Sequence, residues 1–280
     1  MKLQQFEDAK QFYERVKDYL LIHEAMHNVQ LALCHALIHN PERFEEKPYL
    51  AIVEADGDII AVVMKTKSRN LLLSMIHDFV AIEAIAQNLL STQNLLPGVN
   101  GPTAEAKAFA ENWHSLTGQS YQLKMALRAF QLEQVQIISK ANGYLRQATQ
   151  SDREILIRWF AAFVLEALHT PPTNTERAVD NHLQRGTAYI WEDIIPVSMA
   201  CHTGVTPNGA GVSMVYTPPE YRQKGYASAC VAALSQILLQ QGYKYCFLFT
   251  DLANPTSNHI YQAIGYRVVG DLYDYCFLSD

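Results

Sequence analysis

The sequence predicts an α/β protein with mixed β-sheets, organised as two domains, and three observations support this prediction. The chain has 280 residues, a length that suits two domains of about 140 residues each. Apolar residues make up 49% of it and charged residues 18%, which is enough apolar material for packed cores. Predicted strands alternate with predicted helices, and the order helix, strand, strand, strand, helix, strand, helix, strand occurs twice.

The first half of the chain gives the first copy of this order. Residues 6–40 contain neither Pro nor Gly and predict one helix. The pair Asp56 and Gly57 predicts a tight turn between two strands. Gly118 is the expected stop of a helix that begins at Thr103. The remaining predicted elements are strands at 48–54, 59–65, 71–76 and 121–132, an extended stretch at 97–102, and helices at 79–90 and 103–116.

The second half repeats the order. Ser151 and Glu154 have the spacing of a capping box and predict the start of a helix. Gly242 and Gly265 are the expected stops of two later helices. The predicted helices lie at 151–169, within 171–186, at 227–241 and at 254–264, and the predicted strands at 144–148, 187–192, 196–202, 212–217, 245–251 and 267–278.

The repeated order implies a boundary between two domains. Residues 134–143 lie between the last strand of the first copy and the first strand of the second, and they are the expected linker. The expected domains are therefore residues 1–138 and residues 139–280.

One loop of the second half has the features of a phosphate-binding site. Residues 222–227 have the form R-x-x-G-x-A and lie between a predicted strand and a predicted helix. Unpaired N–H groups at a helix N-terminus and the helix dipole both favour a bound anion. Gly225 has no side chain to block its approach, Ala227 has little, and Arg222 and Lys224 add positive charge. A tight turn without a ligand would use similar residues, so the loop alone leaves both interpretations open.

Two motifs together give the chain a resemblance to a known family. Residues 219–225 contain P-E-Y-R-Q-K-G, and residues 254–266 contain N-P-T-S-N-H-I-Y-Q-A-I-G-Y. Residues 222–227 resemble the loop Q/R-x-x-G-x-G/A of the GNAT superfamily of N-acetyltransferases, with Ala227 in the last place, and residues 219–225 resemble the form P-E-Y-R-x-K-G that commonly surrounds it. The other motif is similar to that family's pattern N-x-x-S-x-x-x-Y-x-x-x-G-F/Y. The resemblance covers residues 144–280 well and implies two tandem acyl-CoA N-acyltransferase domains, with catalysis in the C-terminal one.

The resemblance implies acetyl-CoA as the co-substrate, with no metal, and it assigns roles to residues. The backbone amides of 223–228 would hold the pyrophosphate, and the strand end at 215–217 would hold the pantetheine arm and the thioester. Asn254 would bind the pantetheine amide region, and Tyr261 would protonate the leaving thiolate. A phenol with a pKa of about 10 is a plausible acid for a thiolate of about 8.5 or more. The implied donor-binding residues are Val215, Tyr216, Thr217, Arg222, Gln223, Lys224, Gly225, Tyr226, Ala227, Ser228, Asn254 and Ser257.

The sequence does not identify the general base that would deprotonate the amine. Some members of the family place a carboxylate on the strand before the loop, but residues 212–217 contain no Asp or Glu. Glu192, Asp251 and His202 are the candidates, and each is also explained as a strand-end or turn residue. A water-mediated route is equally compatible with the sequence.

The first half resembles the family only in the order of its elements. Its corresponding strand-to-helix junction, residues 72–79, contains L-L-S-M-I-H-D-F, with no glycine, no Lys or Arg, and an acid at Asp78. We therefore expect a degenerate copy that does not bind CoA. The two-part arrangement is similar to that of a bacterial group of tandem acetyltransferases, whose recurrent segments resemble residues 97–102 and 249–255.

Residues 23–27 have the sequence H-E-A-M-H, which raises a different possibility. In this pattern two histidines one helical turn apart hold zinc, and the glutamate activates water. His23 and His27 share a predicted helix face with apolar residues, and no histidine extension of the metzincin kind follows. Candidate third ligands, Glu42 among them, fall in a predicted loop. We expect structural histidines here, and a zinc hydrolase that uses His23 and His27 is the alternative to test.

Composition limits the classes of function further. The formal net charge is −6 and no run of Lys or Arg occurs, which argues against nucleic acid as the main partner. No apolar run reaches transmembrane length, which argues against a membrane partner. The five cysteines are widely spaced, which is typical of reduced thiols, so a cytoplasmic protein is expected.

The sequence thus predicts an N-acetyltransferase that moves acetyl from acetyl-CoA to a primary amine by direct attack in a ternary complex. A protein that binds or senses acetyl-CoA without catalysis is the alternative from another class, and a longer acyl chain is a closer one. The acceptor, a small-molecule amine or a peptide amine, is left open, as is the oligomeric state.

Overall fold

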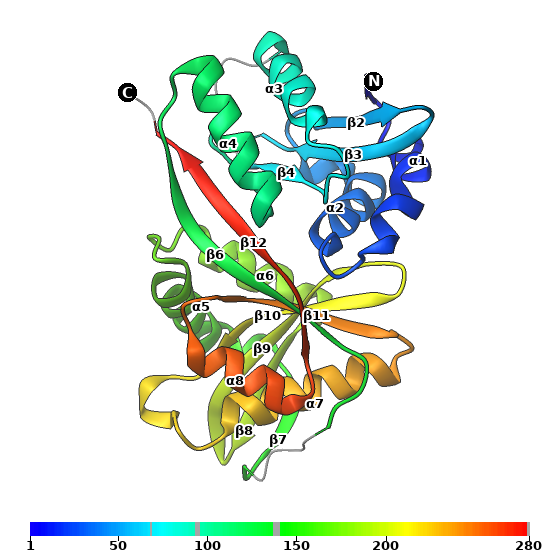
Figure 1. Ribbon diagram of the computed structural model, residues 1–280. Helices are drawn as coiled ribbons and strands as arrows, with labels where there is room; N and C mark the ends of the chain where they lie inside the picture. Colours follow the sequence, from blue (N-terminus) through cyan, green and yellow to red (C-terminus); the bar gives the residue numbers. More distant parts are fainter. Residues whose placement is uncertain (68, 93–95, 137–140, 279–280) are drawn as a thin grey trace. The chain divides into compact units, whose positions relative to one another are not determined.

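The computed structural model describes residues 1–67, 69–92, 96–136 and 141–278. The chain divides into two compact units (Figure 1). Unit 1 comprises Met1–Ala129, Asp251–Ala253 and Val269–Asp280, and unit 2 comprises Phe130–Thr250 and Asn254–Val268. The expected boundary between residues 138 and 139 lies outside the described residues. The sequence did not indicate that the C-terminal segment is part of unit 1.

Unit 1 contains a mixed sheet with the strand order β1-β2-β3-β4-β5-β12. Strands β4 and β5 are parallel, and the other neighbours are antiparallel. Its elements are β1 (Lys2–Gln5), α1 (Ala9–Ile22), α2 (Asn28–His39), a 3-10 turn (Pro41–Arg43), β2 (Tyr49–Ala55), β3 (Asp58–Lys65), β4 (Leu71–Leu73), α3 (Val80–Thr92), β5 (Gly98–Pro102), α4 (Thr103–Thr117), most of β6 (Tyr121–Leu132) and most of β12 (Arg267–Phe277).

The sheet of unit 1 is buried on both faces because helices cover each of them. On β2, Ala51 and Val53 pack into the core beneath α3 and α4, whereas Leu50 and Ile52 pack into the core beneath α1 and α2. Side chains alternate between the faces of a strand, so a strand covered on both sides has a continuous apolar sequence. This explains why β2 and β3 lack the alternation of apolar and polar residues.

Two features of unit 1 test the predicted elements directly. The tight turn is confirmed, since Asp56 and Gly57 join β2 to β3 with φ angles of 53° and 94°. The single helix over residues 6–40 is wrong, because the chain forms a turn at residues 23–27 between α1 and α2. Strand β1 was not predicted, because its sequence K-L-Q-Q is mostly polar and exposed, with Leu3 as its one half-buried residue.

The strands of unit 2 follow the order β11-β10-β9-β8-β7 and are also of mixed direction. Strands β10 and β11 are parallel, and the pairs from β10 to β7 are antiparallel. Its elements are the end of β6, β7 (Tyr144–Gln147), a 3-10 turn (Gln150–Asp152), α5 (Arg153–Leu168), α6 (Thr175–Arg185), β8 (Ala188–Asp193), β9 (Ile195–Val205), β10 (Gly209–Tyr216), a 3-10 turn (Pro219–Tyr221), α7 (Tyr226–Gln240), β11 (Tyr245–Asp251), α8 (Pro255–Ile264) and the start of β12.

Helices also cover both faces of the sheet in unit 2. One core contains Cys230 and Leu234 of α7 with Tyr261 of α8. The core on the other face contains Trp159 and Phe160 of α5. The mixed α/β fold class is therefore confirmed in each unit.

The predicted capping box at Ser151 and Glu154 is wrong by two residues. Thr149 and Asp152 form it instead: the Asp152 carboxylate accepts from the Thr149 amide at 2.8 Å, and α5 begins at Arg153. Asp152 is held there by Arg146, whose guanidinium donates to both of its oxygens at 2.8 Å. Across the described ranges, no helix combines the length and the apolar character needed to cross a membrane.

Candidate functional site

Strands β10 and β11 separate as they approach the candidate loop. They pair over three residues only, and the last pair joins Gly211 to Phe247. Both strands are fully described and continue to Tyr216 and Asp251 without further pairing to each other. Backbone N–H and C=O groups require partners, so the end of a parallel pair that stops early can bind an extended ligand.

A bulge in β10 accompanies this separation. The register with β9 shifts between Ser213 and Tyr216, and Met214 has a φ of 54°, in the left-handed region that a non-glycine residue rarely adopts. Met214 and Tyr216 pack against the core beneath α5, whereas Val215 packs against the core beneath α7. The hydroxyl of Ser198 on β9 donates to the Tyr216 carbonyl at 3.1 Å and lies 2.9 Å from the Thr217 hydroxyl.

The candidate loop leads from the end of β10 into the N-terminus of α7. Gln223 and Gly225 both have positive φ angles, 62° and 80°, and Gly225 is the residue that precedes the helix. Residues 222–225 are exposed, and Tyr226, Ala227 and Ser228 are half-buried in the first turn of α7. Along the described ranges of the chain, no backbone acceptor pairs with the amides of Gln223 and Lys224. The loop thus presents free N–H groups beside a helix N-terminus.

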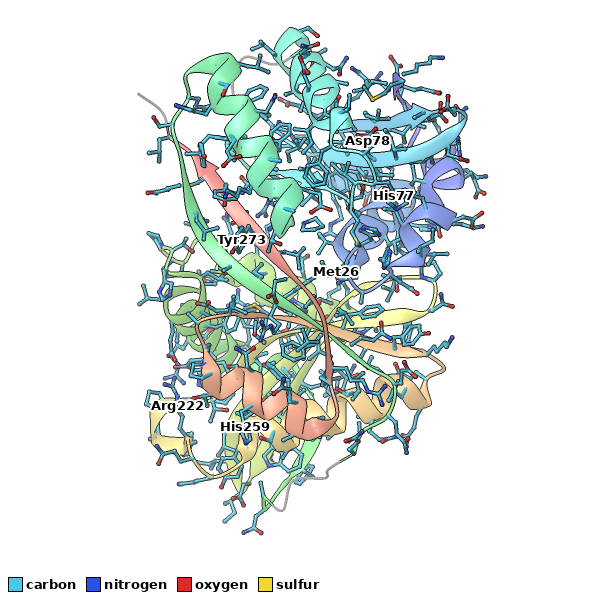
Figure 2. The ribbon with its side chains drawn as sticks, viewed as in Figure 1. Met26, His77, Asp78, Arg222, His259 and Tyr273 are labelled. Atoms are coloured by element: carbon cyan, nitrogen blue, oxygen red, sulfur yellow. The ribbon has the colours of Figure 1, made fainter. Side chains whose placement is uncertain are left out.

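Two cations border this loop. Arg222 projects from it (Figure 2) and donates from Nε to the Thr217 carbonyl at 2.9 Å and from Nη2 to the Glu166 carboxylate at 2.7 Å. Its guanidinium also lies 5.9 Å from the centre of the Tyr216 ring. The Lys224 ammonium lies 5.8 Å from the centre of the Tyr221 ring. Both cations remain at the surface, where an anion can reach them.

Tyr261 lies on α8 in the core beneath α7. Tyr261 is 8% exposed, and its ring makes edge contacts with Phe130 at 6.2 Å and Tyr266 at 6.0 Å between ring centres. Burial, with a smaller contribution from the nearby Cys230, raises the pKa of the Tyr261 phenol above its ordinary value of 10. The phenol therefore keeps its proton throughout the neutral range, as a proton donor must.

Asn254 has a structural role that the motif did not indicate. Its side-chain oxygen accepts from the Ser257 amide at 3.0 Å and so caps the N-terminus of α8. The side-chain amide group of Asn254 makes no bond to a described residue and is free to donate to a ligand. Asn254 is exposed and Ser257 is half-buried.

The three candidate bases have different surroundings. The Glu192 carboxylate accepts from Arg146 and from the Tyr144 hydroxyl, and both bonds lower the pKa of Glu192, which makes it a weak base. The Asp251 carboxylate accepts from the Ala253 amide at 2.8 Å in the turn after β11.

His202 is the third candidate, and its ring is different because Nε2 is buried without a hydrogen-bond partner within the described chain. Burial lowers the pKa of His202, so the ring is neutral at pH 7. However, His202 lies opposite Val212, whereas Met199 lies opposite Tyr216 at the strand end. Its position is therefore about four residues, or roughly 13 Å along the strand, from the end of β10 that leads to the candidate loop.

In the corresponding loop of unit 1, the backbone amides already donate to acceptors of the protein itself. It follows β4, which pairs in parallel with β5 as β10 does with β11. The Met75 amide donates to Nε2 of His27 at 3.0 Å, and the Ile76 amide donates to the carboxylate of Glu105 at 3.2 Å. The amides of residues 74 and 77 donate to carbonyls of β3. The side chains of His77 and Asp78, labelled in Figure 2, are exposed. No amide of residues 74–77 is left for an anion.

These bonds also explain the H-E-A-M-H sequence. His27 is 1% exposed, its Nδ1 lies 3.0 Å from the Leu20 carbonyl, and its Nε2 accepts from Met75. The tautomer is thereby fixed, with the proton on Nδ1, and neither nitrogen has a lone pair free for a metal. The described ranges contain no group of three or more His, Cys, Asp or Glu side chains suited to a metal ion.

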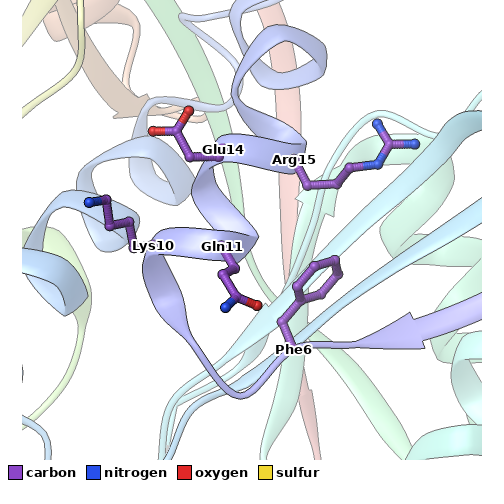
Figure 3. A pocket seen from close by; sticks show the side chains of 5 residues that line it. All are labelled: Phe6, Lys10, Gln11, Glu14 and Arg15. Atoms are coloured by element: carbon purple, nitrogen blue, oxygen red, sulfur yellow. The ribbon is translucent and has the colours of Figure 1, made fainter.

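A hollow of about 520 Å³ lies on the outer side of α1 (Figure 3). Its lining residues are Phe6, Lys10, Gln11, Glu14 and Arg15. Arg15 is engaged by the carboxylate of Glu54, and Lys10 and Glu14 carry opposite charges. The hollow contains no residue of the two motifs and no concentration of one charge.

The chain matches one family model over part of its length and several solved structures over nearly all of it. Residues 196–276 match the family model described as FR47-like protein. A search of curated protein sequences gives no match. Among solved structures, an acetyltransferase of the GNAT family from Colwellia psychrerythraea is 11% identical, with a TM-score of 0.56, and the likeness covers 99% of this chain and 100% of that one.

Two further solved structures match over nearly the full length. A Drosophila protein is 10% identical with a TM-score of 0.69, and the match covers 99% of this chain and 98% of that one. A tandem GNAT protein from the clavulanic acid biosynthesis pathway is 10% identical with a TM-score of 0.53, and the match covers all of both chains. At these identities the structures show a common fold.

Proposed function

We propose that this chain, which has the GNAT fold and whose matches support membership of the GNAT superfamily, transfers an acetyl group from acetyl-CoA to a primary amine. The observation that carries the proposal is the loop at 222–227, with the free amides of Gln223 and Lys224, its two cations and its place after β10, at the end where β10 and β11 no longer pair. The donor would bind in unit 2 only, because the amides of the equivalent loop in unit 1 are already bonded.

The chemistry would proceed by direct attack within a ternary complex. The pyrophosphate would bind the amides at 223–228, and the pantetheine arm would lie along the opened end of β10. Asn254 would offer its free amide group to the arm. The amine would attack the thioester carbonyl, and Tyr261 would give its proton to the departing thiolate. The acceptor amine would lose its proton to water.

The first test is a calorimetric titration of the protein with acetyl-CoA. One site per chain is expected. Gly225→Glu should abolish or greatly weaken binding, because it places a carboxylate where the phosphates would lie. Gly57→Glu is the matched control, since Gly57 also has a positive φ, of 94°, but lies in the β2–β3 turn of unit 1. Equal affinity in both variants would remove the loop from the donor site.

Tyr261→Phe tests the proton donor separately. It should lower kcat about 100-fold while leaving the affinity for acetyl-CoA nearly unchanged, which is the range for loss of a general acid. An unchanged kcat would remove Tyr261 from the mechanism. Tight binding of acetyl-CoA without release of thiol over a broad panel of amines would favour the alternative function, a non-catalytic acetyl-CoA sensor.

A further inference from the structure

We propose that Glu166 is a positioning residue for the donor: it holds the guanidinium of Arg222 at the end of β10, ready for the donor's phosphates. Glu166 lies on α5, 56 residues before Arg222, and belongs to neither motif. This inference rests on the proposed function, since it assigns Arg222 to the phosphates of acetyl-CoA.

The contacts of Arg222 fix its head group on three sides. Nε donates to the Thr217 carbonyl at 2.9 Å, Nη2 donates to Glu166 at 2.7 Å, and the guanidinium lies 5.9 Å from the centre of the Tyr216 ring. The first contact closes residues 217–222 into a compact turn, and the contact with Glu166 ties that turn to α5. An arginine has five N–H groups in a rigid fork, so these contacts leave others for an anion.

The position of Glu166 in its helix supports a role outside the helix. It lies near the C-terminal end of α5 (Arg153–Leu168), where exposed carbonyls and the helix dipole disfavour an acid. The last turn of α5 contains no basic residue that would offset this cost. The Arg222 guanidinium supplies the compensating charge, so the acid at this position is explained by the loop and not by α5 itself.

A guanidinium that Glu166 immobilises should bind phosphate more tightly than the same guanidinium without that partner. The side chains of Arg222 and Glu166 are 40% and 55% exposed, so their pairing adds little to the stability of the fold. Its effect on binding is different, because an immobilised arginine loses less conformational entropy when the phosphate arrives. The alternative is that the carboxylate competes with the phosphate for Arg222, and this alternative predicts the opposite sign.

The test compares two donors and two matched variants. Glu166→Gln should raise KM for acetyl-CoA about three- to tenfold and leave kcat nearly unchanged. It should leave the KM for S-acetylpantetheine unchanged, because that donor has no pyrophosphate. Glu154→Gln is the control, since Glu154 is an exposed acid on the same helix that pairs with Arg153 and not with the loop. It should change neither KM.

A double-mutant cycle tests whether Glu166 acts through Arg222. Arg222→Lys keeps the charge but cannot bridge Thr217 and Glu166 together, so it should weaken acetyl-CoA binding by a similar factor. In the Arg222→Lys background, Glu166→Gln should have no further effect. Additive effects of the two substitutions would overturn the inference.

The outcomes separate this inference from the function on which it rests. If the wild type does not bind acetyl-CoA, the proposed function is overturned and the inference with it. If the wild type binds and Glu166→Gln behaves as Glu154→Gln does, or binds more tightly, only the inference is overturned. An equal effect of Glu166→Gln on both donors would also overturn it, because it would indicate a structural role.

Discussion

Mild acid should destabilise unit 1 through one buried histidine. His27 donates to the Leu20 carbonyl from Nδ1 and accepts from the Met75 amide at Nε2, so the folded state requires the neutral ring. Burial lowers the pKa of His27 from 6.5 to about 4. Between these two values the unfolded chain binds a proton that the folded chain does not. The contribution of the neutral His27 to the free energy of unfolding is therefore fully present above pH 6.5 and is lost as the pH falls toward 4.

The magnitude follows from the two pKa values. The free energy of unfolding should fall by about 2 kcal/mol between pH 7 and pH 5, and by about 3 kcal/mol when the pH is below 4. The assay is hydrogen exchange of β2 and β3 amides in increasing urea at a series of pH values. His27→Gln removes the titrating ring and should lower stability at pH 7, since it does not restore both bonds, but it should remove this part of the acid sensitivity.

The control lies in unit 2. Burial also lowers the pKa of His182 to about 4, and its Nδ1 lies 2.7 Å from the Thr187 hydroxyl. His182→Gln should therefore reduce the acid sensitivity of unit 2 and leave that of β2 and β3 as in the wild type. If β2 and β3 lose the same stability with acid in the wild type and in His27→Gln, the assignment of His27 as the acid-sensitive group is refuted.

Three other predictions concern a glycine contact, an ion pair and a pair of strands. Gly98→Ala would place a Cβ 2.1 Å from the Tyr275 carbonyl, so it should lower the free energy of unfolding by about 3 kcal/mol or prevent folding. The control Gly118→Ala has a positive φ but open space around it, so thermal unfolding should show a loss of only about 1 kcal/mol. Arg146→Met leaves Asp152 without its bidentate partner, so urea unfolding should show a loss of about 1–3 kcal/mol at pH 7. The Arg146 ion pair lowers the pKa of Asp152, so this loss should shrink as the pH falls below 4, and a loss independent of pH would contradict the assignment. Ending the chain after Val268 should expose the amides of β5 to rapid hydrogen exchange, and protected β5 amides would show that β12 is dispensable.

The sequence predicts those parts of the fold and site that depend on local patterns. The hairpin at Asp56 and Gly57 follows from the turn preference of two adjacent residues. The loop at 222–227 follows from a glycine and two cations between a strand and a helix, and the structure places these residues together at the start of α7. Each of these features is specified within about ten residues of chain.

Features that depend on distant contacts were not predicted. The break at residues 23–27 contains no Gly or Pro; it occurs where His27 bonds back to Leu20 and across to Met75, and tertiary contacts there override helix propensity. Glu166 gave no local signal except its position near a helix end, because its partner is 56 residues away. The bulge at Met214 has no sequence marker, since its residue is neither glycine nor asparagine.

Strand β12 has a consequence for the synthesis of the protein. It pairs with β5 from Leu272 opposite Pro102 to Cys276 opposite Gly98, and Tyr275 and Phe277 complete the core beneath α3 and α4. A ribosome makes β12 after α8, so unit 1 begins to emerge first but cannot be completed until nearly all of unit 2 has been made. Until then the edge of β5 lacks its partner, and a nascent chain with an open edge is prone to pair with other chains. Translational pausing between α8 and β12, or a chaperone that covers β5, would therefore affect unit 1 more than unit 2.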